Sequence, residues 1–272
     1  MKRFLALLLV FLLLVSAASA EKKKSNPEPR VITEEVIEEV PEQIQQLLDL
    51  AYSEMEACNG QNMKKRNKYT DWNGSHTGYG WCGGFITWCT LEVGIPQYAK
   101  NKAPKEPVPG VVHINEAGVG KLVDGYMRMN NRITMTPQKG FIVVYGNGHS
   151  KNKKFGGLTK NYHVGLVYDV EKLENGKYRL TTIEGNVTMD FTDEAGERHK
   201  TSYTIRMYVR DYDPHAEKLT QNLTLVPEEE QDRPESLTFS YEYTYGNTGM
   251  YISRFLMPWI PEENAEPGEI AE

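Results

Sequence analysis

The order of apolar patterns along the 272-residue chain is the feature that most constrains its fold. Apolar residues at helical spacing predict helices over residues 41–58, 82–93 and 119–130. Strand-like patterns come afterwards, at 140–145, 164–173, 177–184 and 203–212, with weaker ones at 237–245 and 251–255. Helices followed by strands predict an α+β fold in which N-terminal helices pack on an antiparallel sheet.

The first 20 residues have the pattern of a secretory signal peptide. Lys2 and Arg3 precede an apolar run from Phe4 to Val15, and small residues at 17–20 form a cleavage site. A transmembrane anchor is the alternative, but the apolar run is short for a span of the bilayer. We therefore expect cleavage after residue 20 and a secreted protein, in the cell envelope or outside the cell, with no membrane contact.

The remaining sequence divides into three parts by composition. Residues 21–40 are charged and interrupted by proline, which predicts a linker. Residues 258–272 are acidic and proline-containing, which predicts a disordered tail. Residues 41–257 suffice for one domain with a full core, in which the part after about residue 213 reads as a β extension.

Charge and ligand patterns exclude some classes of partner. The formal net charge of −6 does not favour nucleic-acid binding, and no repeat suggests assembly, so a monomer is expected. Asp71 stands in a polar and aromatic loop at 67–79, but a single carboxylate is a poor ligand set for a hard cation. We expect neither a metal nor a cofactor.

Cys82 lies within the segment Trp81–Cys89, between an aromatic residue and two glycines, where a helical pattern begins. A helix N-terminus lowers the pKa of a thiol, and its free N–H groups can face a developing oxyanion. An isolated cysteine is more often a small buried hydrophobe. Here, however, His163 and the pair Glu184 and Asn186 follow downstream, and they supply the base and the orienting group of a thiol hydrolase.

The three cysteines allow two redox states. Cys82 and Cys89 are seven residues apart, about 10 Å on one helix, which is beyond the reach of a disulfide. An internal bridge would therefore join Cys58 to Cys89 and leave Cys82 free. The alternative is that all three remain reduced, and both alternatives stay open.

A hairpin at Asn175-Gly176 relates the histidine to the polar pair. With a two-residue turn, Glu174 would face Lys177, and all the polar candidates would project from one face of the sheet. In that register Asn186 is diagonal to His163, and Glu184 is one step further unless a bulge intervenes. The other expected pairs are Val167 with Glu184, Gly165 with Asn186 and His163 with Thr188.

These motifs resemble the CHAP domain, the cysteine, histidine-dependent amidohydrolase/peptidase family. The segments Trp81–Cys89, His163–Val167 and Thr182–Asn186 follow the family's order, and Tyr69–Gly74 resembles the stretch before its cysteine. The resemblance covers roughly residues 41–212. It implies a papain-like core and a peptidoglycan substrate. The family's strand after Gly140 usually begins with Asp, whereas this chain has Phe141.

The resemblance implies that Cys82 is the nucleophile, His163 the base, Glu184 the group orienting the histidine and Asn186 a fourth polar member. The implied enzyme is an N-acetylmuramoyl-L-alanine amidase or a peptidoglycan endopeptidase, with an oxyanion donor from the 67–79 loop beside the Cys82 N–H. Three other interpretations remain: an NlpC-like endopeptidase, a non-catalytic wall-binding module, and a conjugating or toxin-like cysteine enzyme.

Overall fold

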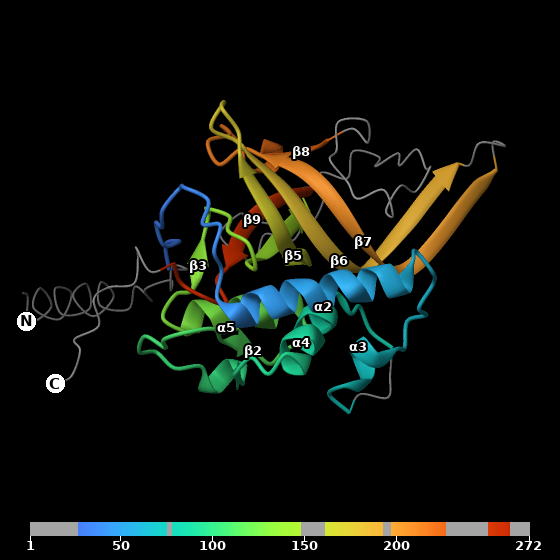
Figure 1. Ribbon diagram of the computed structural model, residues 1–272, viewed down its shortest axis with the longest axis horizontal. Coiled ribbons are helices and arrows are strands. Elements are labelled where there is room, and N and C mark those ends of the chain that lie inside the picture. Colours follow the sequence, from blue (N-terminus) through green and yellow to red (C-terminus); the bar gives the residue numbers. More distant parts are fainter. Residues whose placement is uncertain (1–26, 75–77, 148–160, 193–196, 227–249, 262–272) are drawn as a thin grey trace, which may run out of the picture.

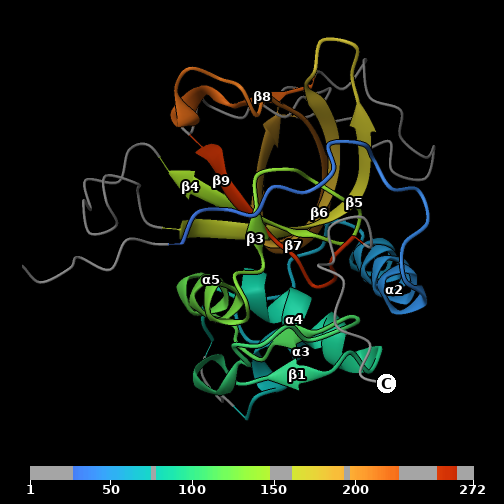
Figure 2. The ribbon, with the colours of Figure 1, turned by 90° about the vertical axis from the view of Figure 1, so that its left-hand side faces the viewer.

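The computed structural model describes residues 27–74, 78–147, 161–192, 197–226 and 250–261 (Figure 1). Within them the chain forms two layers, a strongly curved antiparallel sheet and a set of helices beneath it (Figures 1 and 2). The expected α+β class is confirmed, although two short strands precede the helix at residues 119–128. The expected signal peptide at 1–20 and the strand expected at 237–245 lie outside the described residues.

The first described helix, α2 (Glu42–Cys58), has the ends that its sequence predicts. Pro41 precedes it, and proline suits a helix start because it has no backbone N–H that would be left without a partner. Asn59 ends it with a φ of 43°, in the left-handed region that asparagine tolerates. The buried stripe of α2 consists of Ile44, Leu47, Leu48, Ala51, Met55 and Cys58.

Helix α4 (Cys82–Glu92) packs closely against its surroundings from its first turn. A Cβ atom on Gly83 would lie 2.4 Å from the Ala117 carbonyl oxygen, and one on Gly84 would lie 2.4 Å from the Tyr69 carbonyl oxygen. Side chains at these positions would push the helix start away from its neighbours. The other described helices are α3 (Lys68–Asp71), inside the expected 67–79 loop, α5 (Val119–Arg128), and the 3-10 turns η1 (Lys100–Lys102) and η2 (Leu219–Gln221).

Seven described strands form the sheet in the order β3-β9-β4-β5-β6-β7-β8. Part of the expected β extension is therefore internal to the sheet: β9, the last described strand in sequence, lies between β3 and β4 and pairs with both, whereas β8 lies at an edge. A separate parallel pair joins β1 (Gln97–Tyr98) to β2 (His113–Ile114). The strands of the large sheet are β3 (Ile133–Thr134), β4 (Ile142–Asn147), β5 (Asn161–Lys172), β6 (Tyr178–Thr192), β7 (Arg198–Tyr212), β8 (Leu223–Leu225) and β9 (Met250–Leu256).

The curved sheet is linked back on itself through Asn222, which lies just before β8. Its side-chain Nδ2 donates to the Ile252 carbonyl oxygen at 2.8 Å, and its Oδ1 accepts from the Ile252 N–H at 2.9 Å. The amide thus contacts the β9 backbone as a neighbouring strand would. The sheet therefore has an enclosed concave face as well as a face that the helices cover.

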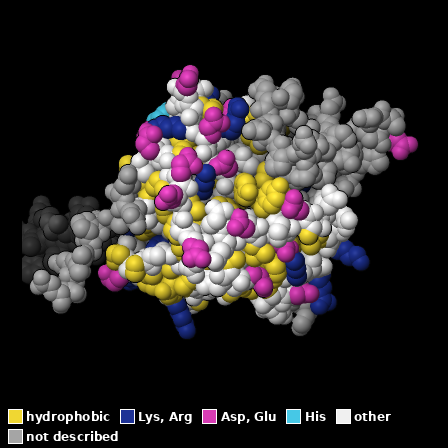
Figure 3. All heavy atoms as spheres, viewed as in Figure 1, with side chains coloured by type: hydrophobic (Ala, Val, Ile, Leu, Met, Phe, Trp, Pro, Cys, Tyr) yellow, Lys and Arg dark blue, Asp and Glu magenta, His cyan; other side chains and the backbone are white. Residues whose placement is uncertain are grey.

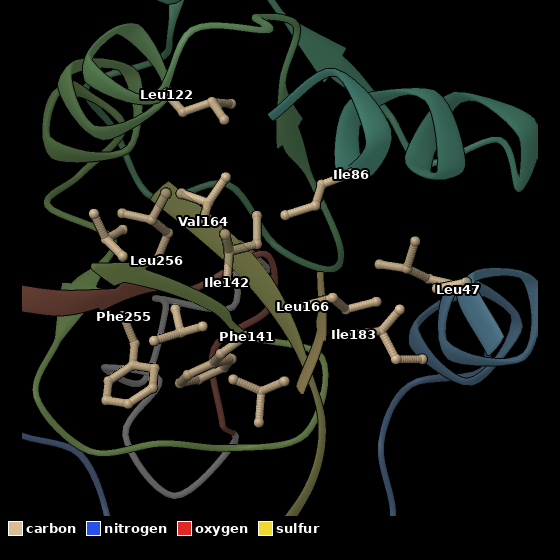
Figure 4. Packing of buried hydrophobic residues seen from close by; sticks show 14 of the residues in the cluster. Leu47, Ile86, Leu122, Phe141, Ile142, Val164, Leu166, Ile183, Phe255 and Leu256 are labelled. Carbon is tan, nitrogen blue, oxygen red and sulfur yellow. The ribbon is translucent and has the colours of Figure 1, made fainter. Parts of the chain in front are cut away.

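The two faces of the sheet bury different side chains. On the helix-covered face, Ile86 of α4 and Leu47 of α2 lie toward Leu166 and Ile183 of the paired strands β5 and β6 (Figure 4). Phe255 lies on the other face (Figure 4). The alternation of side chains along the paired strands puts the polar residues described below on that face too. Gly185 faces the helices, and a Cβ there would lie 2.7 Å from the Trp81 ring. This close approach fixes the start of α4 against β6.

Residues 27–40, expected as a linker, instead pack along the domain. Ile32 is 3% exposed and belongs to the core. The Arg30 N–H donates to the Ile133 carbonyl oxygen at 2.7 Å, and Gln138 bonds the backbone of both Glu35 and Ile37. The charged composition of this stretch hides the fact that Ile32 enters the core and that Val36, Ile37 and Val40 pack against it.

The start of the expected tail also packs on the domain. Trp259 is buried, its Nε1 donates to the Lys139 carbonyl oxygen at 3.0 Å, and its ring meets that of Phe141 edge to face at 5.6 Å. Phe141, which departs from the family pattern, is thus a packing partner of the C-terminal segment. Residues 262–272 lie outside the described part of the chain.

Among the described residues, the face drawn in Figure 3 carries no charged patch of a single sign. Acidic and basic side chains are interspersed there among apolar and neutral polar atoms. None of the described helices combines the length and apolar character needed to cross a bilayer.

Replacing Ile32→Ala should lower the free energy of unfolding by roughly 2–5 kcal/mol, because a buried isoleucine leaves a cavity. Its neighbour Val31, which is 91% exposed, provides the control. Val31→Ala should change stability by less than about 0.5 kcal/mol. Urea unfolding of both variants measures the difference. Equal midpoints for the two would mean that residues 27–40 are a linker after all.

Candidate active site

Cys82 is the first residue of α4 and is almost fully buried where the helix start meets β5. Its sulfur accepts hydrogen bonds from the backbone N–H groups of Val164 and Gly83, and it bonds the side chain of His163. The first N–H groups of a helix have no carbonyl partner within it. The sulfur therefore lies among donors that favour a thiolate.

The pKa values of Cys82 and His163 are displaced toward an ion pair. Burial by itself raises the pKa of the Cys82 thiol, but the hydrogen bond and positive charge of His163 outweigh it and lower the pKa below its ordinary value. Burial disfavours the imidazolium, yet the bonds to Cys82 and Glu184 raise the pKa of His163 to about 10. A thiolate and an imidazolium are the resting forms that this geometry favours near neutral pH.

The hairpin that joins β5 to β6 differs from the expected register in two places. Leu173, rather than Glu174, pairs with Lys177, so the turn contains one more residue than expected, with Gly176 at a φ of 80°. A bulge at Tyr168 shifts the ladder once more, after which Leu166 faces Ile183. A shift of one residue alone would move the polar side chains of β6 to the opposite face of the sheet. The two shifts together amount to two residues, so these side chains stay on the expected face although their partners on β5 change.

The new register brings Glu184 one step closer to His163, to the place beside Gly165 that is diagonal to the histidine. His163 Nε2 lies 2.9 Å from Glu184 Oε2, whereas the two-residue turn had placed Asn186 nearer. Gly165 makes room for the carboxylate, because a Cβ there would lie 2.7 Å from Glu184 Cγ. Since Nε2 contacts the carboxylate, Nδ1 is the ring nitrogen left for Cys82.

The Glu184 carboxylate is fully buried, and three further groups donate to its other oxygen. Tyr145 OH and Thr182 Oγ1 each lie 2.8 Å from Oε1, and Arg210 Nη1 lies at 2.5 Å. Burial raises the pKa of a carboxyl group, but Arg210 and His163 hold the pKa of Glu184 well below its usual range. Glu184 is thus a carboxylate between two cations.

Sequence analysis missed Tyr145 and Arg210. Tyr145 is fully buried, stacks on His163 with ring centroids 5.8 Å apart, and has a pKa raised well above its usual value by burial, so it remains a donor. Arg210 belongs to an alternating strand pattern that also contains Arg206, so no local signal marks it as having a buried partner. The partner itself could not be named, because it depends on the pairing of β6 with β7.

Asn186 occupies a different position from the one expected. It is the bulged residue of β6 opposite β7 and has a φ of 62°, which asparagine adopts more readily than most residues. Its Nδ2 lies beside Gly80, and its buried Oδ1 has no hydrogen-bond partner among the described residues. The structure therefore places Asn186 next to the segment that leads into Cys82.

The remaining cysteines are separate from this cluster. All three cysteines are free and buried, so no Cys58–Cys89 bridge is present. Cys58 Sγ lies 3.3 Å from Thr204 Oγ1, and burial raises the pKa of the Cys89 thiol well above its ordinary value. Among the described residues, no three His, Cys, Asp or Glu side chains gather as metal ligands would.

No protein-family model, curated protein or solved structure matches this chain. The case for its function therefore depends on the three ordered motifs and on the contacts of Cys82, His163 and Glu184. These contacts bring a thiol, an imidazole and a carboxylate into one line, an arrangement that can carry out nucleophilic catalysis.

Iodoacetamide near neutral pH should label Cys82 at least ~10-fold faster than Cys89, because alkylation requires the thiolate. Peptide mass spectrometry of samples taken over time would give the rate at each cysteine. Cys82→Ser should remove the fast label without changing the others. Faster labelling of Cys89 than of Cys82 would contradict the assignment of the reactive thiol.

Proposed function

We propose that this chain is a secreted cysteine hydrolase with a papain-like core that cleaves amide bonds of peptidoglycan through an acyl-enzyme. The observation that carries the proposal is the buried line from Cys82 through His163 to Glu184, at a helix N-terminus. A binding module has no need of a buried ion pair at this place, because desolvating charges costs stability. Among the alternatives, this line favours an enzyme.

In the first half of the proposed reaction, the Cys82 thiolate attacks the amide carbonyl carbon and forms a carbon–sulfur bond. The carbonyl oxygen becomes an oxyanion, which the Cys82 N–H at the start of α4 can bind. A second donor from the 67–79 loop remains a prediction. The His163 imidazolium gives its proton to the leaving nitrogen, the carbon–nitrogen bond breaks, and a thioester remains.

In the second half, the neutral imidazole of His163 takes a proton from water as the oxygen attacks the thioester. The carbon–sulfur bond breaks, the carboxylic acid product leaves, and the thiolate–imidazolium pair is restored. Glu184 stays ionised throughout and holds the ring through Nε2. Its role resembles that of the carboxylate in a catalytic triad, which orients the base and stabilises its charged form.

The substrate class is supported by the resemblance of three ordered motifs to CHAP domains and by the signal-like pattern of residues 1–20. Peptidoglycan contains two kinds of amide that fit this chemistry. One joins the sugar to the stem peptide, and the other lies within the stem or cross-bridge peptides. A CHAP-like enzyme is favoured over an NlpC-like one by the Glu-Gly-Asn sequence at 184–186.

Purified peptidoglycan incubated with the protein should release new amino groups, because each cleaved amide frees one amine. Mass spectrometry of the fragments would assign the bond: free stem peptides indicate an amidase, and shortened stems indicate an endopeptidase. Cys82→Ala should lower the rate by at least ~10³-fold, since it removes the nucleophile. Amine release by Cys82→Ala at the wild-type rate would refute the proposal.

The pH dependence of kcat/KM should be bell-shaped, because both members of the ion pair must keep their charge. As the pH falls through the lowered pKa of Cys82, the thiolate gains a proton and the rate falls. As the pH rises through about 10, His163 loses the proton that the leaving nitrogen needs. Initial rates in constant ionic strength buffers would show both limbs, and an alkaline limb centred below pH 7 would contradict this reading.

A further inference from the structure

We propose that Arg210 is a positioning residue that keeps Glu184 ionised and turned toward His163, so that the Cys82–His163 ion pair can form. This inference rests on the proposed function and extends it to a residue two strands away from the histidine. The Arg210 side chain bonds Glu184, Tyr145 and Thr182. It acts through Glu184.

The contacts divide the carboxylate into two halves. Arg210, Tyr145 and Thr182 all donate to Oε1, whereas His163 contacts Oε2. Arg210 Nη1 also lies 2.9 Å from Tyr145 OH and 3.2 Å from Thr182 Oγ1, so the three donors contact one another. The carboxylate plane is therefore fixed from one side, and its second oxygen points at the ring.

Burial makes the charge of Arg210 decisive. The Arg210 side chain is 4% exposed, and that of Glu184 is fully buried. A buried carboxyl group without a cation takes up a proton, because ionisation in a low dielectric is costly. The hydroxyls of Tyr145 and Thr182 donate hydrogen bonds but carry no positive charge. His163 alone is a poor counter-ion here, because its own charge depends on that of Glu184.

The arrangement gives four groups of alternating charge: Arg210, Glu184, His163 and Cys82. Each opposite neighbour favours the charged form of the next. Loss of the Arg210 charge should therefore make the charged forms of Glu184, His163 and Cys82 less favourable in turn. The guanidinium itself is supported by two rings, with its Cζ 4.3 Å from the Tyr208 centroid and 5.2 Å from that of Tyr145.

A second arginine on the same strand provides a matched comparison. Arg206 faces Glu184 across the β6–β7 ladder and is buried to a similar degree. Its guanidinium, however, lies over the Tyr208 ring, 5.8 Å from the centroid. If a positive charge near the carboxylate were sufficient to keep Glu184 ionised, replacing Arg206 or Arg210 would have the same effect on Cys82. If a direct hydrogen bond to the carboxylate is needed, only the replacement of Arg210 should have a large effect.

The test is the pH dependence of Cys82 alkylation by iodoacetamide, which needs no substrate. In Arg210→Gln the midpoint should move up by about one pH unit or more, so that alkylation well below the midpoint is about tenfold slower. Arg210→Lys keeps the positive charge, so its midpoint should lie close to that of the wild type. Arg206→Gln should move the midpoint by less than about a third of that amount.

A double-mutant cycle tests whether Arg210 acts through the carboxylate. In a Glu184→Gln background, Arg210→Gln should cause no further shift. An equal shift with and without the carboxylate, or equal shifts in Arg206→Gln and Arg210→Gln, would overturn the proposal. So would an unchanged midpoint in folded Arg210→Gln.

If Arg210→Gln does not fold, Arg210→Lys carries the test. A midpoint within about half a pH unit of wild type then supports the proposal, and a larger shift overturns it. The proposed function fails separately: it is refuted if wild-type Cys82 is unreactive or if peptidoglycan is not cleaved, whereas Arg210 is judged by shifts among variants of a reactive protein.

Discussion

The buried carboxylate of Glu184 is the constraint on which the rest of the site depends. Because this carboxylate has no exposure to water, its hydrogen-bond donors must come from the protein. They come from β4, β5, β6 and β7, four strands that are neighbours in the sheet, in the side chains of Tyr145, His163, Thr182 and Arg210. The glycine at 165 leaves the space in which the carboxylate can meet them. Side chains from four neighbouring strands thus meet at one charge.

Much of the site could be predicted from the sequence, because local patterns specify local structure. The helix that begins at Cys82 and the strand that carries His163 were both expected, and so was the common face of His163 and Glu184. That last prediction was correct although its pairs were wrong: a longer turn and a bulge at Tyr168 each displaced the ladder by one residue. Side chains alternate with a period of two, so two single displacements restore the face.

The parts that could not be predicted depend on contacts between distant segments. Nothing near Arg210 in the sequence indicates that its partner is Glu184, 26 residues earlier. Nothing in the charged stretch before residue 40 indicates that Ile32 enters the core. Composition averages over a segment, whereas one buried side chain is enough to hold it. For the same reason Trp259 packs on Phe141 although the sequence around it is acidic and rich in proline.

The internal position of β9 has a consequence for how the chain reaches its native state. Strand β4 pairs with β5 on one side and with β9 on the other, yet more than 100 residues separate β4 from β9 in sequence. Chain synthesis proceeds from the N-terminus, so β4 is complete long before its second partner exists. Until then one edge of β4 has unpaired backbone groups, and such edges attract other chains. Closing so long a loop is slow, so this edge of the domain stays exposed to aggregation until β9 has been made and has paired.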